Sequence, residues 1–378
     1  MRHPHPPPRN RDDGPEVADI LRDHAFGLRL NSVQARAAGA IVRCRTATLG
    51  GHREVCKACG LVRHAYNSCR NRHCPKCQGL QQALWAERQR VLALPTAYYQ
   101  IVFTIPGELH RLFRRAPEQC LSLLFQAVSE TLLEVGRSHL GGDIGFTAVL
   151  HTWSQKLRFH PHVHCIVPAG VWRDLRWVPT GNRFFLPLGK LQPVFKGKLL
   201  GKVRAAVAAG ELPLPEDEAR DLIARAGHKT WSIRIEPPLE GPDHVVEYLS
   251  RYVHRIAISN SRIIRYDRQT VVFRYKDRQD GNKAKLNPVS GEKFSRLFLQ
   301  HVLPDRFVRI RHYGLLASRR RKDLERCREQ LGGRKPPKPN KESWDVAFRR
   351  LFGTDPLLCP RCHLGRLVVL DVLPPLRM

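Results

Sequence analysis

The chain has 378 residues, enough for two or three domains, and its 42% hydrophobic content fits a globular protein with a sizeable core. Its 64 Lys and Arg residues outnumber 34 Asp and Glu residues, and the formal net charge of +30 indicates a polyanionic partner. The basic residues are spread along the chain without a polybasic amphipathic helix or a lipidation motif, which favours nucleic acid over an acidic membrane. No stretch has the apolar length of a membrane span or a signal peptide, so we expect a cytoplasmic protein.

The N-terminal part of the chain predicts a tail and two helices with a cysteine-rich segment between them. Residues 1–22 are rich in Pro, Arg and Asp and are expected to form a disordered tail. A helix is expected from Asn31, whose side chain can cap it, and a second helix over 80–94. The segment 44–77 between these helices holds six of the eleven cysteines. In a reducing compartment, this crowding indicates metal ligands in preference to disulfides.

The middle of the chain mixes predicted strands and helices at irregular intervals. Strands are expected at 97–106, 145–157, 162–172, 183–188 and 229–238, with a hairpin at 262–277. Helices are expected over most of 108–140, 190–227 and 244–257, and a strongly basic helix at 318–332 could lie on phosphates or form a solvated face. This order predicts an α+β fold around an antiparallel sheet.

Two CxxC pairs, Cys56 with Cys59 and Cys74 with Cys77, are separated by fourteen residues. Two such knuckles are what a tetrahedral zinc ion requires, so these four cysteines are predicted to hold zinc. Cys69 and His73 lie inside the loop and could replace one of the four ligands.

Three basic residues, Arg70, Arg72 and Lys76, lie beside the predicted zinc site and could contact DNA phosphates or bases. A further CxxC pair, Cys359 and Cys362, has no partner pair in the sequence. This pair could be completed by His363 and a distant residue, or it could be unligated.

The histidines of the stretch 151–164 suggest a second metal site. His162 and His164 point to the same face of a predicted strand, because alternate residues of a strand share a face. If 145–157 and 162–172 form a hairpin that turns near 157 and 158, His151 lies roughly opposite His164 and three imidazoles converge. Gln155 shares the face of His151 and is a rival third ligand, whereas His160 is expected to face solvent or DNA.

Two tyrosines lie one turn apart on the predicted helix 244–257. Tyr248 and Tyr252 fall on the border of its apolar stripe, beside Arg255, so their rings can pack while both hydroxyls reach a cleft. In a basic chain with a histidine pair that can bind metal, these tyrosines are predicted to be paired nucleophiles rather than ordinary boundary residues.

In this order, the zinc module, the strand ending in "FTIP", "HPHVH" and "EYLSRYVHRIAISNSRI" resemble the IS91 family of transposases, within the HUH superfamily of rolling-circle endonucleases. The resemblance covers about residues 25–330. It implies that His162 and His164 are paired metal ligands, joined here by His151, and that Tyr248 and Tyr252 are the two nucleophiles of a Y2 enzyme. It also implies 5′-phosphotyrosine intermediates, catalytic Mg or Mn, and single-stranded DNA at insertion-sequence ends as the substrate. Arg251 and Arg255 could contact that DNA, and the metal, Arg251 or Arg255 is needed to help form the phenolate.

The resemblance also divides the chain. After the tail come a zinc-binding DNA-recognition domain at 25–95, a HUH nuclease-transposase domain with an antiparallel sheet at 96–280 and a basic helical region at 281–330. A linker at 331–343 leads to a C-terminal segment at 344–378. The expected location is the bacterial cytoplasm, with the nucleoid. The alternative is a zinc-dependent DNA-binding protein without nuclease activity, which leaves the histidine and tyrosine pairs without a purpose.

Overall fold

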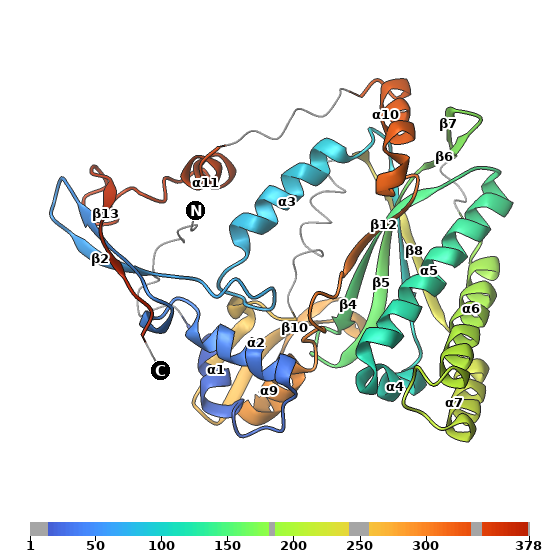
Figure 1. The fold of residues 1–378 in the computed structure, drawn as a ribbon, viewed down its shortest axis with the longest axis horizontal. Helices are drawn as coiled ribbons and strands as arrows, with labels where there is room; N and C mark the ends of the chain where they lie inside the picture. Colours follow the sequence, from blue (N-terminus) through green and yellow to red (C-terminus); the bar gives the residue numbers. More distant parts are fainter. Residues whose placement is uncertain (1–13, 181–185, 242–256, 334–341, 377–378) are drawn as a thin grey trace.

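The computed structural model describes residues 14–180, 186–241, 257–333 and 342–376, and Figure 1 shows its fold. The predicted helix with Tyr248 and Tyr252, together with Arg251 and Arg255, lies outside these residues. Half of the predicted strand 183–188 and most of the linker 331–343 lie outside them too. No helix within the described ranges is long and apolar enough to cross a membrane.

A five-stranded antiparallel sheet forms the centre of the molecule, in the order β12-β4-β5-β3-β8. Its strands are β3 (Tyr98–Thr104), β4 (Gly145–Trp153), β5 (Phe159–Pro168), β8 (Ser232–Leu239) and β12 (Ile310–Gly314). β4 and β5 form a hairpin, and β5 then pairs with β3, so the three central strands come from two separate parts of the chain. The predicted antiparallel α+β fold is therefore confirmed.

One face of this sheet is covered by helices (Figure 1). They are α4 (His110–Arg115), α5 (Pro117–Leu140), α6 (Leu188–Ala208) and α7 (Glu216–His228). Alternate strand residues such as Ile101, Phe103 and Val163 point to this face and are completely buried in the main core. α5 begins at Pro117, which needs no hydrogen-bond partner at a first helical position, and ends at Gly141 in the left-handed conformation.

The opposite face of the sheet carries the polar residues of the candidate site. Next to them, Tyr98, Val149 and Ile166 form a small apolar cluster with Trp85 of α3 (Gly79–Leu92). α3 thus lies across the sheet from α5 and α6 (Figure 1). Because successive side chains of a strand point to opposite faces, the apolar side chains face the large core and the histidines face the side with the small apolar cluster.

A second core lies below the sheet in Figure 1. It combines residues 17–44 with residues 257–299. It joins α1 (Val17–His24) and α2 (Ser32–Arg43) to α9 (Gly291–Leu299) and to a three-stranded sheet of β9 (Ile263–Tyr266), β10 (Thr270–Asp277) and β11 (Lys283–Ser290). The side chain of Asn31 accepts the backbone N–H of Gln34, which confirms the predicted cap of α2. The predicted tail over 1–22 is wrong for its last residues, because Val17, Ile20 and Leu21 of α1 are fully buried in this core.

The remaining elements lie at the periphery. A third sheet has the order β13-β1-β2 and contains β1 (Gly51–Cys56), β2 (Val62–Tyr66) and β13 (Leu367–Leu373). α11 (Trp344–Phe352) lies beside α3, and Arg350 pairs with Glu87. α10 (Arg321–Gln330), the predicted basic helix, packs on the hairpin of β6 (Gly170–Arg173) and β7 (Arg176–Pro179). Two strands, β11 and β12, lie in the segment 281–330 that was predicted to be helical, and β12 completes an edge of the central sheet.

Candidate active site and metal centres

Three histidines on β4 and β5 converge on one point of the sheet face opposite α5 and α6. His151 is paired in register with His162, and His164 follows two residues later on the same face. One ring nitrogen from each of the three lies within 4.8 Å of the others. The ring centroids of His151 and His164 are 4.6 Å apart, and those of His162 and His164 are 4.9 Å apart. The predicted convergence is present, although His151 lies opposite His162 and not His164.

The surroundings of His162 prepare its ring for a metal ion. Nδ1 of His162 lies 2.7 Å from the backbone carbonyl of His160. Since a carbonyl can only accept, Nδ1 carries the proton and Nε2 keeps its lone pair. Burial lowers the pKa of His162 to about 3, so the ring is neutral at neutral pH. A neutral imidazole with a fixed tautomer is the form that ligates metals.

Gln100 of β3 supports His164 from the neighbouring strand. Nε2 of its amide lies 2.9 Å from Nδ1 of His164, and the contact is buried. In this orientation the amide N–H donates to Nδ1 of His164; with the amide turned over, its carbonyl oxygen accepts the Nδ1 proton and Nε2 of His164 keeps its lone pair. Sequence patterns do not single out Gln100, because its role follows only from the pairing of β3 with β5.

The turn between β4 and β5 is held in place by contacts with the second core. Leu157 has a positive φ of 60° and is fully buried in the second core. His301 lies 3.0 Å through Nε2 from the carbonyl of Leu157 and 3.1 Å through Nδ1 from the hydroxyl of Thr152. Gln155, the rival third ligand, belongs to this turn beyond the end of β4, and Arg262 donates to its backbone carbonyl. His151 therefore completes the group of three.

A second row of imidazoles adjoins the three histidines. The ring centroid of His160 lies 5.2 Å from that of His162 and 6.1 Å from that of His110 on α4. Burial lowers the pKa of His160, and it lowers the pKa of His110 to about 4. His160, which was expected to face solvent or DNA, is half-buried at the edge of the site. His110 was not predicted from the sequence.

The cysteines form two separate clusters. Cys44, at the end of α2, meets Cys69, Cys74 and Cys77, with one sulfur from each within 4.8 Å of the others. The Sγ atoms of Cys69 and Cys77 are 3.6 Å apart, and the backbone N–H of Cys69 donates to Sγ of Cys44 over 3.4 Å. Cys69, predicted as a possible replacement, is in this cluster, whereas His73 accepts a backbone hydrogen bond from Leu303 instead.

The predicted quartet of two CxxC pairs is not brought together. Cys56 and Cys59 meet Cys359 and Cys362, and only Cys74 and Cys77 belong to the first cluster. The physical reason is β2, which lies between Cys59 and Cys69. Its five residues are extended over about 16 Å and carry the chain away from the first pair. Loop length alone did not reveal that the intervening residues are extended.

The basic residues near the first cluster differ in their exposure. Arg70 is exposed, but Arg72 is turned inward and donates to the carbonyls of Phe307 and Pro304 over 2.6 and 2.7 Å. Lys76 pairs with Glu16. The structure thus leaves only Arg70 of these three at the surface.

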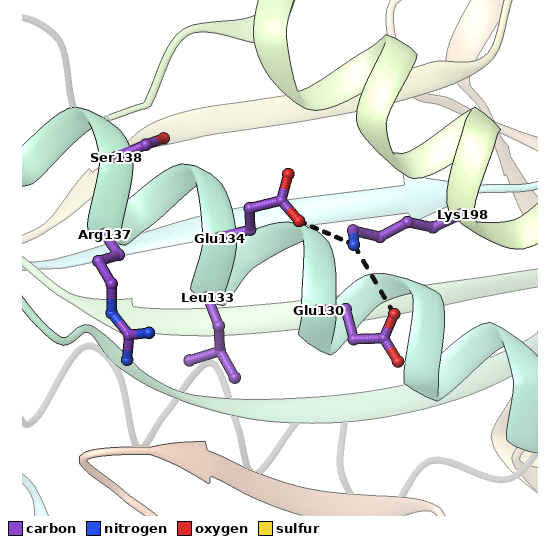
Figure 2. A pocket seen from close by; sticks show the side chains of 6 residues that line it. All are labelled: Glu130, Leu133, Glu134, Arg137, Ser138 and Lys198. Carbon is purple, nitrogen blue, oxygen red and sulfur yellow. Dashed lines mark ion pairs between the residues drawn. The ribbon is translucent and has the colours of Figure 1, made fainter.

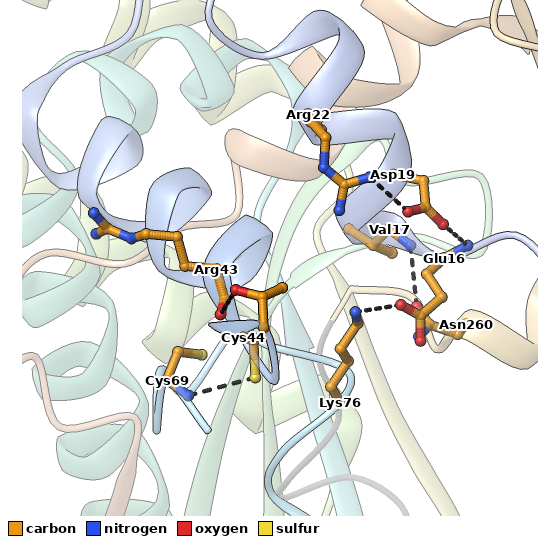
Figure 3. A network of polar contacts seen from close by, with 10 residues as sticks. Glu16, Val17, Asp19, Arg22, Arg43, Cys44, Cys69, Lys76 and Asn260 are labelled. Carbon is orange, nitrogen blue, oxygen red and sulfur yellow. Dashed lines mark hydrogen bonds and ion pairs between the residues drawn. The ribbon is translucent and has the colours of Figure 1, made fainter. Parts of the chain in front are cut away.

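A polar network ties α1 to the chain directly after residues 242–256. Figure 3 shows Glu16 between Lys76 and Asn260, whose amide donates to the Glu16 carboxylate over 3.1 Å. The backbone N–H of Val17 donates to Asn260 over 3.1 Å as well. The cysteine module and the chain that follows the tyrosine segment are therefore held together.

A hollow of about 700 Å³ lies between α5 and α6, on the helical side of the sheet. Figure 2 shows Lys198 reaching across it to Glu134, at 2.8 Å, and to Glu130, at 3.8 Å. Its charged groups neutralise one another, and these helices cover the sheet face opposite the histidines. This hollow is not part of the histidine site.

Comparison with known proteins agrees with this architecture. Residues 145–323 match the family described as a putative transposase (Y2_Tnp), and residues 17–105 match the transposase zinc-binding domain (Zn_Tnp_IS91). The chain is similar to the putative transposase y4qJ of Sinorhizobium fredii (strain NBRC 101917 / NGR234), with 39% identity over 381 residues that cover 95% of this chain and 96% of the relative. It is also similar to the transposase for insertion sequence element IS801 of Pseudomonas savastanoi pv. phaseolicola, with 26% identity over 349 residues that cover 88% and 82%. No solved structure matches the chain.

A zinc-binding module joined to an antiparallel sheet, together with these matches, defines a transposase, an enzyme that cuts and joins DNA. The chain belongs to the IS91 family of transposases. Zinc is accordingly a structural component of the protein, and DNA is its partner.

Proposed function

We propose that the chain nicks and rejoins single-stranded DNA at insertion-sequence ends through 5′-phosphotyrosine intermediates. The observation that carries this proposal is the convergence of His151, His162 and His164 on one face of an antiparallel sheet. The match to the Y2 family spans both these histidines and the segment with Tyr248 and Tyr252. The substrate is then single-stranded DNA at the ends of the element and at its target, at the bacterial nucleoid.

The donor set fits a divalent ion. In His162 the Nδ1 proton is bound by a backbone carbonyl, and in His164 Nδ1 is held by Gln100, so both rings can turn Nε2 toward a common point. Imidazole ligands suit Zn, Fe or Ni by softness, whereas phosphoryl chemistry usually employs Mg or Mn, so the proposal of Mg or Mn follows the family and not the donor set. When bound, the ion would polarise the scissile phosphate and offset the charge that develops on it.

The covalent step belongs to the tyrosines. A tyrosine oxygen attacks phosphorus, the bond between phosphorus and the 3′ oxygen breaks, and the proton lost by the phenol balances the one gained by the 3′ hydroxyl. Because a free tyrosine has a pKa of about 10, we assign the role of favouring the phenolate to the metal ion, Arg251 or Arg255. The phosphotyrosine bond stores the energy of the cleaved bond, so rejoining needs no external source of energy.

The zinc module is proposed to position the DNA. Cys44, Cys69, Cys74 and Cys77 are the proposed ligands of its ion, since their four sulfurs meet inside the matched domain. Arg70 projects from the loop between these ligands and is proposed to contact phosphate. α10 adds further positive charge, with Arg321 and Arg326 on its surface.

An end-labelled oligonucleotide that carries an end of the mobile element tests this function. Incubation with Mg or Mn should give a nick at one position, and a chelator applied after zinc loading should stop it. His151→Ala should stop it as well, while binding of the oligonucleotide persists. Binding without a nick in either metal would favour the alternative of a DNA-binding protein without nuclease activity.

A further inference from the structure

We propose that Cys56, Cys59, Cys359 and Cys362 hold a second zinc ion that joins the two ends of the chain. One pair lies in the N-terminal module and the other lies 300 residues later, beyond both segments that match known families. The site goes beyond the proposed function, which assigns no role to these four cysteines.

The sulfur distances fit a tetrahedral ion. Zn–S bonds of about 2.3 Å in a tetrahedron place the sulfurs about 3.8 Å from one another. Sγ of Cys56 lies 3.7 Å from Sγ of Cys362, and Sγ of Cys59 lies 3.6 Å from Sγ of Cys359. These separations are far longer than a disulfide bond of about 2.05 Å, and all four cysteines are free thiols.

Both pairs have the backbone form of a metal knuckle. The N–H of Gly60 bonds to the carbonyl of Cys56 over 2.9 Å, and the N–H of His363 bonds to that of Cys359 over 3.0 Å. Gly60 and His363 both have positive φ angles, of 68° and 52°. His363, considered from sequence as a ligand, is thus the turn residue of its knuckle, and four cysteines already close the coordination sphere.

The two knuckles fit closely against each other. A side chain at Gly365 would place its Cβ 2.5 Å from Sγ of Cys56 and 2.6 Å from Cβ of Ala58, so only glycine is accommodated. The N–H of Gly365 also donates to Sγ of Cys362 over 3.4 Å, a bond that stabilises a thiolate. Cys56 and Cys359 are 1% and 0% exposed, whereas Cys59 and Cys362 are half-buried, so the cluster lies at the edge of this part of the molecule.

Burial of apolar surface alone does not hold this part of the molecule together. The local apolar cluster has only three buried members, Cys56, Cys359 and Leu367. Val369 and Val372 of β13 are 58% and 69% exposed, although β13 pairs with β1 along its length. A strand with so little buried surface needs another source of stability, and a structural zinc ion supplies it directly. The ion therefore fixes β13 to β1 and makes the C-terminal segment part of the N-terminal module.

Metal content of the full-length protein tests the site. The wild-type protein should carry two zinc ions per chain, and Cys359→Ser with Cys362→Ser should carry one. Cys327→Ala, at a buried cysteine of α10 outside both clusters, is the matched control and should keep two. In the cobalt-substituted protein, the double variant should lose about half of the thiolate-to-cobalt absorbance. One zinc in the wild type, or two in the double variant, would overturn the proposal.

Hydrogen exchange distinguishes loss of the site from general unfolding. In the double variant, the amides of β1 and β13 should exchange faster, while those of β3 and α5 keep their wild-type protection. Unchanged protection of β13 would show that the ion does not hold the strand and would overturn that part of the proposal. Neither readout depends on cleavage, so a failure of the proposed nuclease function would leave both results unaffected.

Discussion

His151 and His162 face each other across the β4–β5 hairpin, paired in register, with their ring centroids 5.4 Å apart. This pairing is fixed by the turn at residues 154–158, since a slip of one residue would send every side chain of β5 to the other face. Leu157 anchors that turn in the second core, and His301 binds its carbonyl. The geometry of the histidine site is therefore set by packing that lies beneath it.

Removal of two of the imidazoles should separate cleavage from binding. His162→Ala with His164→Ala should abolish nicking, because the ion loses two of three protein ligands. Oligonucleotide affinity should stay within a few-fold of wild type, since Lys and Arg contacts with the backbone supply most of it. His139→Ala, at an exposed position on α5, is the control. Equal losses of binding and nicking would make the histidines DNA contacts or structural residues.

Gln100 should affect metal affinity without touching DNA. Gln100→Leu removes the group beside Nδ1 of His164 and should weaken Mn binding about tenfold, as is typical when a partner of a metal-ligating histidine is lost. Gln100→Glu keeps an acceptor at this position and should restore most of the affinity. A Mn titration followed by electron paramagnetic resonance measures both variants. Equal Mn affinity in the wild type and Gln100→Leu would contradict this role.

Arg70 and Arg72 are close in sequence but should behave differently. Arg72→Ala leaves the carbonyls of Phe307 and Pro304 without their donor and should cost about 1–3 kcal/mol in the free energy of unfolding. Arg70→Ala should leave stability unchanged, weaken DNA binding and reduce the salt dependence by about one unit of slope. Urea denaturation and binding at several salt concentrations measure the pair. Loss of DNA binding in Arg72→Ala together with loss of stability in Arg70→Ala would contradict both assignments.

The buried His301 should make the protein sensitive to acid. Burial lowers the pKa of His301 to about 4, below the usual value of about 6.5. As pH falls through this interval, the unfolded chain takes up the proton before the folded chain does. The contribution of His301 to the free energy of unfolding is therefore fully present above about pH 6.5 and is lost toward pH 4. Between about pH 7.5 and 5.5 the loss should be on the order of 1 kcal/mol. His301→Gln should reduce this loss in urea titrations with zinc present, whereas exposed His139→Gln should not. An unchanged loss would refute the assignment.

Local patterns were enough to predict most elements of the fold. The strands β3, β4 and β5 and the capping of α2 by Asn31 follow from neighbouring residues, and the structure confirms them. The histidine convergence could be predicted for the same reason, since its three members lie on one hairpin. Its exact partner register could not, because the length of the turn depends on the burial of Leu157 in a core that includes residues 257–299.

The features that sequence reasoning missed depend on contacts between distant segments. The cysteine pairs were grouped by their separation along the chain, but Cys59 finds Cys359 through the pairing of β1 with β13. Gln100 reaches His164 only because β3 lies beside β5. Arg72 carries charge in a basic loop, and no local signal shows that it binds the carbonyls at 304 and 307.

The direct test of the central claim is the search for a covalent link between the protein and DNA. With Mg or Mn and a single-stranded oligonucleotide of the element's end, the wild-type protein should form an adduct that survives denaturation, and mass spectrometry of its peptides should place the 5′ phosphate on Tyr248 or Tyr252. Tyr248→Phe with Tyr252→Phe should form none, and each single variant should still nick at a reduced rate but fail to complete transfer between two ends. An adduct in the double variant, or transfer at the wild-type rate in a single variant, would contradict the paired-tyrosine account.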